Sequence, residues 1–236
     1  MESKVLNIDC MEFMRSLPDN AFDLCIADPQ YGRGEDGGKK RDHYVRQKNG
    51  SKLFVSDGGY AAKNWDKEPA GEGFFQEVLR VSRSQIIWGV NYFDCMQFTP
   101  GRIVWDKCND GSDQSDCEIA WNSMTDRVDM FRFMWRGMMQ GKSISEGTIQ
   151  QGNKRLNEKR IHPAQKPVAL YVWTMQTFAK PGWTIFDPMM GSQSSRIAAH
   201  ELGFNYFGCE KDKDYFERGE RRFAEYAAQG SLFRKE

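Results

Sequence analysis

The tetrapeptide Asp28-Pro29-Gln30-Tyr31 directly follows an apolar, β-prone stretch, residues 22–27. An amino group on a nucleobase is a poor nucleophile because its lone pair is delocalised into the ring. The carboxylate of Asp28 and the carbonyl of Pro29 can accept the two amino protons and return the lone pair to nitrogen. Tyr31 can stack on the base, a contact worth about 1–3 kcal/mol. The pattern predicts activation of an amino group on a flipped-out base, and a surface turn that happens to read Asp-Pro is the alternative.

A second group of candidate residues lies near the C-terminus. Residues 186–193 join a predicted strand to a predicted helix, and Glu210 ends the following strand. Ligands of open α/β sheets bind at the carboxyl ends of strands, where an acid can accept hydrogen bonds from ribose hydroxyls. Gly191 lets a ligand approach the backbone closely. The pattern predicts a nucleoside site, without the GxGxxG of a dinucleotide site, and an ordinary strand–turn–helix unit is the alternative.

Hydrophobic periodicity predicts the elements that must position these residues. The strands are expected at residues 5–9, 22–27, 85–88, 102–105, 117–121, 127–135, 183–187 and 205–210. The helices are expected at 11–16, 74–79, 164–179, 194–202 and 212–226. The last stretch alternates strand, helix, strand and helix with short links, which is typical of a parallel sheet. We therefore predict a three-layer α/β fold.

Length and composition narrow the class of protein. The chain has 236 residues, 39% hydrophobic and 28% charged, which predicts one globular, soluble domain, 1–236. A polar N-terminus and the lack of an apolar run of about 20 residues argue against a signal peptide and a spanning helix, so we expect a cytoplasmic protein with no membrane partner. Six cysteines without CxxC spacing and three scattered histidines predict neither a disulfide framework nor a metal site.

Charge is concentrated in two segments that lack apolar periodicity, residues 33–71 and residues 136–160. The formal net charge of the chain is zero. Residues 33–71 nevertheless hold nine Lys/Arg and six Asp/Glu, a net charge of +3. Residues 136–166 hold seven Lys/Arg and two Asp/Glu, a net charge of +5. Two basic loops on a neutral body suit a polyanion held at one face. Solvated surface loops explain the same charges.

The motifs together resemble those of the N6-adenine/N4-cytosine DNA methyltransferase family, in the permuted order where the catalytic tetrapeptide precedes the cofactor motif. The tetrapeptide resembles Asp/Ser/Asn-Pro-Pro-Tyr/Phe, residues 187–193 resemble Asp-Pro-Phe-x-Gly-Ser-Gly, and residues 162–167 resemble His-Pro-Thr-Gln-Lys-Pro. Residues 202–210 are similar to the second cofactor strand of the family. The resemblance covers nearly the whole chain apart from the two basic loops, and three motifs in this order are specific.

The resemblance implies a Rossmann-like class I methyltransferase fold with a mostly parallel, seven-stranded sheet and long DNA-facing loops. It implies S-adenosylmethionine as the cofactor, no metal, and double-stranded DNA as the partner. The residues expected around the cofactor are Asp9, Asp28, His162, Gln165, Lys166, Asp187, Gly191, Ser192, Gln193 and Glu210. The residues expected on DNA are Lys39, Lys40, Arg41, Arg46 and Lys48 in the loop 33–71, and Lys154 and Arg155 in a target-recognition segment, 136–160.

Aspartate rather than serine at position 28 favours adenine N6 as the target over cytosine N4, and the cytosine enzyme stays an alternative. Gln30 stands where the family usually has a second proline, and the turn should be less rigid for it. Met189 and Gln193 stand where the family prefers Phe and Gly, which puts cofactor affinity in doubt.

A DNA-binding relative with weakened chemistry is therefore a third hypothesis, and an RNA or protein-glutamine methyltransferase is a weaker fourth hypothesis. A homodimer and a cognate restriction endonuclease are further partners that the sequence leaves open.

Overall fold

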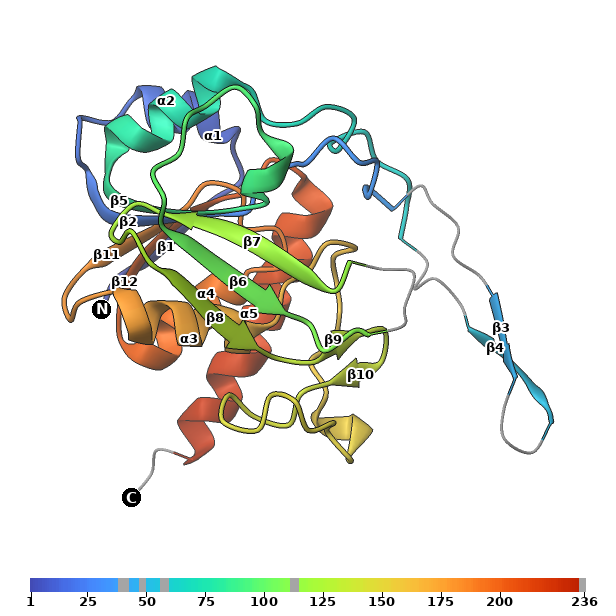
Figure 1. The fold of residues 1–236 in the computed structure, drawn as a ribbon. Coiled ribbons are helices and arrows are strands. Elements are labelled where there is room, and N and C mark those ends of the chain that lie inside the picture. Colours follow the sequence, from blue (N-terminus) through green and yellow to red (C-terminus); the bar gives the residue numbers. More distant parts are fainter. Residues whose placement is uncertain (38–42, 47–49, 56–59, 111–114, 234–236) are drawn as a thin grey trace.

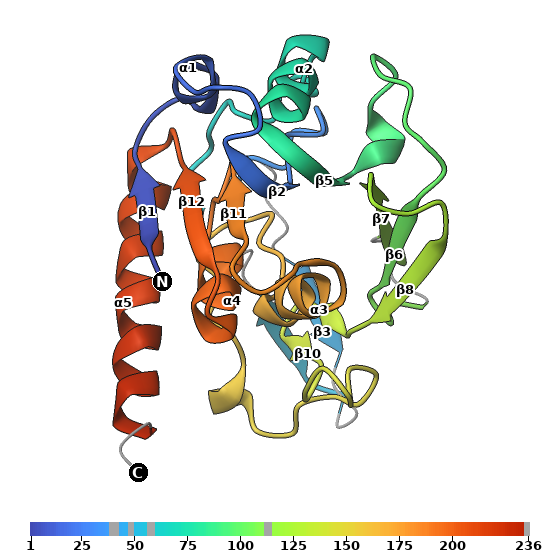
Figure 2. The ribbon, with the colours of Figure 1, turned by 90° about the vertical axis from the view of Figure 1, so that its left-hand side faces the viewer.

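A computed structural model describes residues 1–37, 43–46, 50–55, 60–110 and 115–233 of the chain. Its centre is one eight-stranded sheet, in the order β1-β12-β11-β2-β5-β7-β6-β8 (Figure 2). The strands of this sheet are β1 Ser3–Leu6, β2 Phe22–Ala27, β5 Ser82–Trp88, β6 Arg102–Asp106, β7 Cys117–Asn122, β8 Val128–Arg132, β11 Thr184–Asp187 and β12 Asn205–Cys209.

All neighbouring pairs of the sheet are parallel except the two that involve β7, which runs antiparallel to β5 and to β6. The expectation of a mostly parallel sheet is therefore confirmed. The expected number of seven strands is wrong by one, because β8 adds to the edge of the sheet beside β6.

Helices cover both faces of the sheet, which gives three layers (Figure 1). On one face lie α1 Cys10–Arg15 and α2 Glu72–Val81, and on the other lie α3 Val168–Phe178, α4 Ser194–Leu202 and α5 Lys213–Phe233. In α2 the apolar residues Phe74, Phe75, Val78 and Val81 recur at helical spacing and are buried. Each such side chain contributes roughly 1.5–3 kcal/mol on burial, and this stripe explains why the segment forms a helix against the sheet.

Several element boundaries differ from the sequence prediction for local reasons. The first strand ends at Leu6 rather than at residue 9, because the side chain of Asp9 caps α1 by accepting from the backbone N–H of Met11 at 2.9 Å. The helix predicted from residue 164 begins at Val168, since Pro167 has extended backbone and stands at the N-cap. The predicted strand 127–135 ends at Arg132, and the chain then turns into a separate short strand.

The two basic segments contain short elements of their own. Residues 33–71 include the antiparallel hairpin of β3 His43–Arg46 and β4 Lys52–Val55, so this segment is not wholly a loop. The short hairpin of β9 Trp135–Arg136 and β10 Met139–Gln140 opens the second segment, which also holds the 3-10 helix η2 Lys154–Leu156. In the described part of the chain no helix combines the length and the apolar character needed to cross a bilayer.

Candidate functional site

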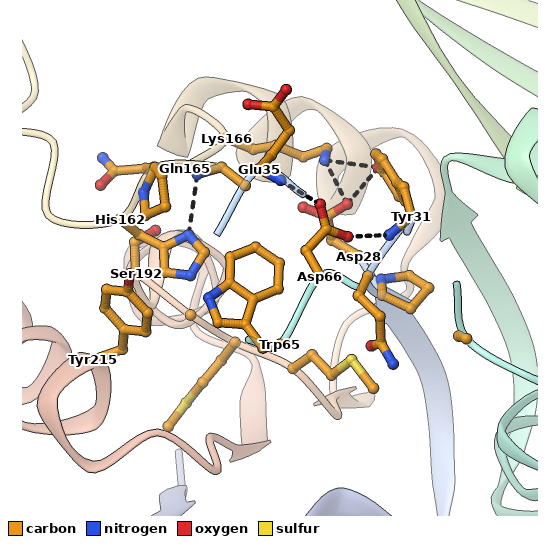
Figure 3. Close-up of a pocket in the computed structure, with 18 of the residues that line it drawn as sticks. Asp28, Tyr31, Glu35, Trp65, Asp66, His162, Gln165, Lys166, Ser192 and Tyr215 are labelled. Atoms are coloured by element: carbon orange, nitrogen blue, oxygen red, sulfur yellow. Dashed lines mark hydrogen bonds and ion pairs between the residues drawn. The ribbon is translucent and has the colours of Figure 1, made fainter. Parts of the chain in front are cut away.

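A cavity of about 1520 Å³ opens where the carboxyl ends of the parallel strands meet (Figure 3). This volume exceeds the 300–1,000 Å³ typical of a pocket for one small ligand. The tetrapeptide after β2, the turn after β11 and the acid after β12 all line it. The topology therefore joins the two candidate sites of the sequence into a single cavity, as strand ends of an open α/β sheet would be expected to do.

The side chain of Asp28 is at the centre of a hydrogen-bonded cluster of charged and polar groups. Its Oδ1 atom lies 2.5 Å from Nζ of Lys166 and accepts the hydroxyl proton of Tyr31 at 2.5 Å. The ammonium of Lys166 also lies 3.0 Å from Oε2 of Glu118, which in turn pairs through Oε1 with Lys107 at 2.5 Å. Two carboxylates and two lysines thus alternate along one wall of the cavity.

Two acceptors beside this cluster have no hydrogen-bond donor in the described part of the chain. Both partners of Asp28 bind its Oδ1, and no described residue donates a hydrogen bond to its Oδ2. The carbonyl oxygen of the neighbouring Pro29 likewise accepts no hydrogen bond within the described part of the chain. Both residues line the cavity, so an amino group placed there can donate one proton to each oxygen.

Burial and charge act in opposite directions on these acids. Burial raises the pKa of Asp28, and the nearby ammonium of Lys166 offsets part of that rise. Burial also acts to raise the pKa of Glu118, but Lys166 and Lys107 hold it at about 2. The two carboxylates keep the pKa of Lys166 above its ordinary value although burial acts to lower it. Lys166 is therefore an ammonium at neutral pH.

The ring of Tyr31 was expected to stack on a base, and one of its faces is already in contact with protein. Tyr92 stacks on it with ring centroids 4.8 Å apart. Gly89 lies so near that a Cβ there would come within 2.1 Å of the ring of Tyr31, and its φ of +73° also favours glycine. The structure thus fixes Tyr31 by packing and directs its hydroxyl at Asp28. Stacking on a base stays a prediction.

Two members of the charged cluster, Glu118 and Lys107, were missed by sequence reasoning. Glu118 is the second residue of β7, which is antiparallel, so the start of this strand lies at the edge where its parallel neighbours end. Lys107 directly follows β6 at the same edge. Only the direction of β7 brings Glu118 to the cavity, and no local sequence signal reveals that direction.

On the other side of the cavity, Glu210 and the turn after β11 form a second polar wall. Glu210 accepts hydrogen bonds from the backbone N–H groups of Gly191 at 3.0 Å and Asp212 at 2.7 Å. Each carboxylate oxygen keeps room for one more donor, as a ribose requires. Burial raises the pKa of Glu210 to about 7. Ser192 lines the same wall, and its carbonyl accepts from Arg222 at 2.7 Å.

Three further residues expected around the cofactor line the cavity but already hold protein partners. Both oxygens of Asp9 are bound, one by the N–H of Met11 and the other by Lys211 at 2.7 Å. Burial lowers the pKa of His162 to about 3, so its ring is neutral. Gln165 accepts from the N–H of Ile161 at 2.9 Å and so fixes the turn that carries its neighbours.

Two residues of the expected cofactor motif do not line the cavity. Asp187 is 1% exposed, and it accepts from the hydroxyl of Ser195 at 2.5 Å and from the N–H of Met189 at 3.0 Å. The side chain of Gln193 turns away from the cavity, donating to Glu220 of α5 at 3.1 Å and accepting from Arg196 of α4 at 2.8 Å. The backbone of Gln193 is left-handed, with φ of +61°, which explains why glycine is preferred at this position.

The residues expected on DNA are only partly within the described chain. Lys39, Lys40, Arg41 and Lys48 lie outside the described residues, and Arg46 belongs to β3, whose side chains are not described. Lys154 and Arg155 are exposed in η2 and do not line the cavity. The DNA contacts of both segments therefore stay predictions.

Residues 60–71 form the returning part of the first basic segment, and residues 63–66, 70 and 71 line the cavity. The indole of Trp65 lies over His162, with ring centroids 5.2 Å apart, and His162 in turn meets Tyr215 at 4.3 Å (Figure 3). All three aromatic rings line the cavity, as Glu210 does. The sequence had marked this segment only as part of a long loop.

Comparison with protein families and curated proteins gives consistent matches. The DNA methylase family model N6_N4_Mtase matches residues 120–221. The chain is 24% identical over 256 residues to the type II methyltransferase M.HinfI of Haemophilus influenzae, covering 94% of this chain and 68% of that protein. It is also 24% identical over 243 residues to the type II methyltransferase M2.MboI of Moraxella bovis, covering 92% and 86% respectively.

Solved structures resemble the fold. The complex of M1.HpyAVI with SAM has a TM-score of 0.52 at 17% identity, covering 94% of this chain and 100% of that chain. The cytosine-N4-specific PvuII DNA methyltransferase has a TM-score of 0.54 at 13% identity, covering 94% and 86%. At this level of identity the likeness concerns the fold, and it agrees with the class I methyltransferase fold that the motifs imply.

Proposed function

Because this chain belongs to the N6-adenine/N4-cytosine DNA methyltransferase family, we propose that it is a site-specific DNA methyltransferase that acts on N6 of a flipped adenine. The cofactor of this family is S-adenosylmethionine. The proposal is carried by the pair of open acceptors in the cavity, Oδ2 of Asp28 and the carbonyl oxygen of Pro29.

These acceptors suit an exocyclic amino group, which carries two protons. When both protons are held, the nitrogen lone pair leaves the ring and becomes nucleophilic. Lys166 and Tyr31 keep Oδ1 of Asp28 occupied, so that Oδ2 has a fixed direction. Such positioning of reacting groups supplies much of the acceleration that an enzyme achieves.

Asp28 has a second task once the amino nitrogen is methylated, since that nitrogen must lose a proton. Burial raises the pKa of Asp28, which makes this carboxylate a better proton acceptor than an exposed aspartate. The Lys166 ammonium offsets part of this rise and favours the charged carboxylate. A carboxylate with this task loses activity in acid, where it is already protonated.

The opposite wall of the cavity suits the cofactor. Glu210, with one free acceptor position on each oxygen, would hold the ribose, and Gly191 and Ser192 would lie along the nucleoside. When bound, S-adenosylmethionine supplies an activated methyl group. His162, which is neutral, adds no positive charge beside a sulfonium cation.

The basic segments would hold the DNA. Residues 33–71 leave directly from the catalytic tetrapeptide, and residues 136–160 carry Lys154 and Arg155 on an exposed turn. Lysine and arginine there would contact phosphates, while base edges in the major groove would be read by side chains of the second segment.

The test is methylation of mixed-sequence duplex DNA with labelled S-adenosylmethionine, followed by mass analysis of the nucleosides. We expect N6-methyladenine with wild-type protein and none above background with Asp28→Ala. N4-methylcytosine would instead establish the cytosine alternative. Long-read sequencing of DNA from cells expressing the protein then gives the sequence context.

A calorimetric titration with S-adenosylmethionine separates the enzyme from a DNA-binding relative without chemistry. Sub-millimolar binding is expected for the enzyme. Three results together would contradict the proposal: the DNA stays unmethylated across many sequences, the protein binds no cofactor, and it still binds DNA tightly.

A further inference from the structure

Asp66 makes an unusual set of contacts with the segment that follows the catalytic tetrapeptide. Its Oδ1 accepts from the backbone N–H groups of Tyr31 at 2.9 Å and Gly32 at 2.8 Å, and its Oδ2 accepts from the N–H of Glu35 at 2.7 Å (Figure 3). Its own carbonyl accepts from the N–H of Gly34 at 2.8 Å. Asp66 is 2% exposed. One buried side chain thus holds most of the backbone donors between residues 31 and 35.

The peptide group between Gln30 and Tyr31 is held at both of its ends. Its N–H, which belongs to Tyr31, donates to Asp66, and its carbonyl, which belongs to Gln30, accepts from the N–H of Ala70 at 3.1 Å. Both partners come from the returning segment, residues 60–71. This peptide plane is adjacent to the one that carries the Pro29 carbonyl, so fixing it restricts the backbone of Gln30, the only residue between the two planes.

The returning segment is itself attached to the body of the protein. Lys63 pairs with Asp212 at 2.8 Å and with Asp214 at 2.9 Å, at the start of α5. A Cβ at Gly32 would come within 2.6 Å of Pro69, so the segment lies in direct contact with the backbone after the tetrapeptide. The contacts of Asp66 are therefore made from a segment held at both ends.

These contacts restrict the backbone at position 30, where this chain has glutamine and the family pattern has a second proline. Proline fixes φ at about −65° by its ring, and glutamine leaves it free. We propose that Asp66 is a positioning residue for the methyl transfer, and that it supplies by hydrogen bonds the rigidity that a second proline supplies covalently. The proposal rests on the proposed function, because it concerns the direction of the Pro29 carbonyl as an acceptor.

A double-mutant cycle between positions 30 and 66 tests this coupling. The four proteins are wild type, Asp66→Ala, Gln30→Pro and the double variant. A proline at position 30 removes no hydrogen bond, because no described group accepts from the N–H of Gln30. Glu68→Ala is the matched control, since it removes an exposed carboxylate from the same segment.

We expect Asp66→Ala to lower kcat by about 10- to 100-fold, because a small misplacement of a reacting group has an effect of this size. The Kd of the variant for S-adenosylmethionine should stay within about threefold of the wild-type Kd. Asp66→Asn, which keeps one acceptor oxygen, should lose less. The double variant should recover at least about fivefold over Asp66→Ala, a larger gain than the same Gln30→Pro change gives in the wild-type background. Equal rates for Asp66→Ala and Glu68→Ala, or no recovery in the double variant, would overturn the proposal.

Hydrogen exchange of the peptide covering residues 29–36 gives a readout that does not depend on chemistry. The backbone amides held by Asp66 should lose protection in Asp66→Ala and keep it in Glu68→Ala, while the rest of the chain is unchanged. Unchanged protection in Asp66→Ala would show that Asp66 does not hold the segment. If wild type methylates no DNA but this exchange pattern is found, the proposed function fails while the structural hold by Asp66 stands. If Asp66→Ala does not fold, Asp66→Asn carries both measurements.

Discussion

The two walls of the cavity both bury carboxylates, but they compensate the negative charge differently. On the wall of the tetrapeptide, Glu118 lies between two lysines and has a pKa of about 2. On the opposite side, Glu210 on the wall and the buried Asp187, which does not itself line the cavity, have only backbone and hydroxyl donors in the described structure, and burial raises the pKa of each to about 7. Asp28, with a single lysine, has a raised pKa despite that partner.

The difference shows that hydrogen-bond donors alone leave the pKa of a buried carboxylate near 7 here, whereas two lysines hold the pKa of Glu118 at about 2 and the single lysine of Asp28 offsets only part of the rise. Charge on the tetrapeptide wall is therefore set by Lys166, and charge on the cofactor wall changes near neutral pH. Three substitutions test this contrast, and a fourth tests the turn beside Glu210; they follow from the largest expected effect to the smallest.

Lys166→Met removes the cation shared by Asp28 and Glu118. The pKa of Asp28 should rise further, because the chief interaction that lowers it is lost. We expect methyl transfer at pH 7 to fall by about 100-fold or more and to recover partly as the pH rises. The pH profile of kcat measures this. Lys107→Met, which removes only the other lysine of Glu118, should cost less, and a wild-type pH profile for Lys166→Met would contradict the assignment.

Asp187→Asn should change the pH dependence of stability. The folded protein holds a proton on Asp187 up to about pH 7, whereas the unfolded chain releases it near its ordinary pKa. Between these values the folded state binds more protons, so wild-type stability falls as pH rises through this window. The variant should gain roughly 2–4 kcal/mol relative to wild type between pH 4 and pH 8.

Denaturant unfolding at several pH values measures this gain. Asp126→Asn is the matched control, because Asp126 is exposed, and it should show no such trend. A constant difference between Asp187→Asn and wild type would mean that Asp187 stays charged in the folded protein.

Glu118→Gln should act on Asp28 in the direction opposite to the lysine substitution. The charge of Glu118 raises the pKa of Asp28, so its removal should move the acid limb of the rate profile to lower pH. Since Lys166 still pairs with Asp28, the rate at pH 7 should stay within about tenfold of wild type. A shift to higher pH would show that Glu118 acts chiefly by holding Lys166 in place.

Gln193→Gly restores the residue that the family prefers. The left-handed backbone becomes relaxed, but the hydrogen bonds to Glu220 of α5 and to Arg196 of α4 are lost. We expect the free energy of unfolding to fall by about 1–2 kcal/mol and the Kd for S-adenosylmethionine to change less than about twofold. Tighter cofactor binding by more than tenfold would mean that Gln193 obstructs the cofactor.

The sequence by itself determined the α/β class, most strands, and the two groups of residues around Asp28 and Glu210. These depend on local patterns, because an apolar run followed by an acid or a glycine-containing turn marks the carboxyl end of a strand wherever the strand lies. The sequence also determined that positions 30 and 193 depart from the family pattern.

Only the tertiary structure decided how the departures are accommodated and how the charges are paired. Asp66 reaches the backbone of Tyr31 from 35 residues away, Glu118 reaches the cavity because β7 is antiparallel, and Gln193 points at α5 rather than at the cavity. Lys166, which lines the cavity, also pairs with Asp28, a contact that the sequence did not predict. Contacts between distant segments depend on strand order and direction, which local periodicity does not encode.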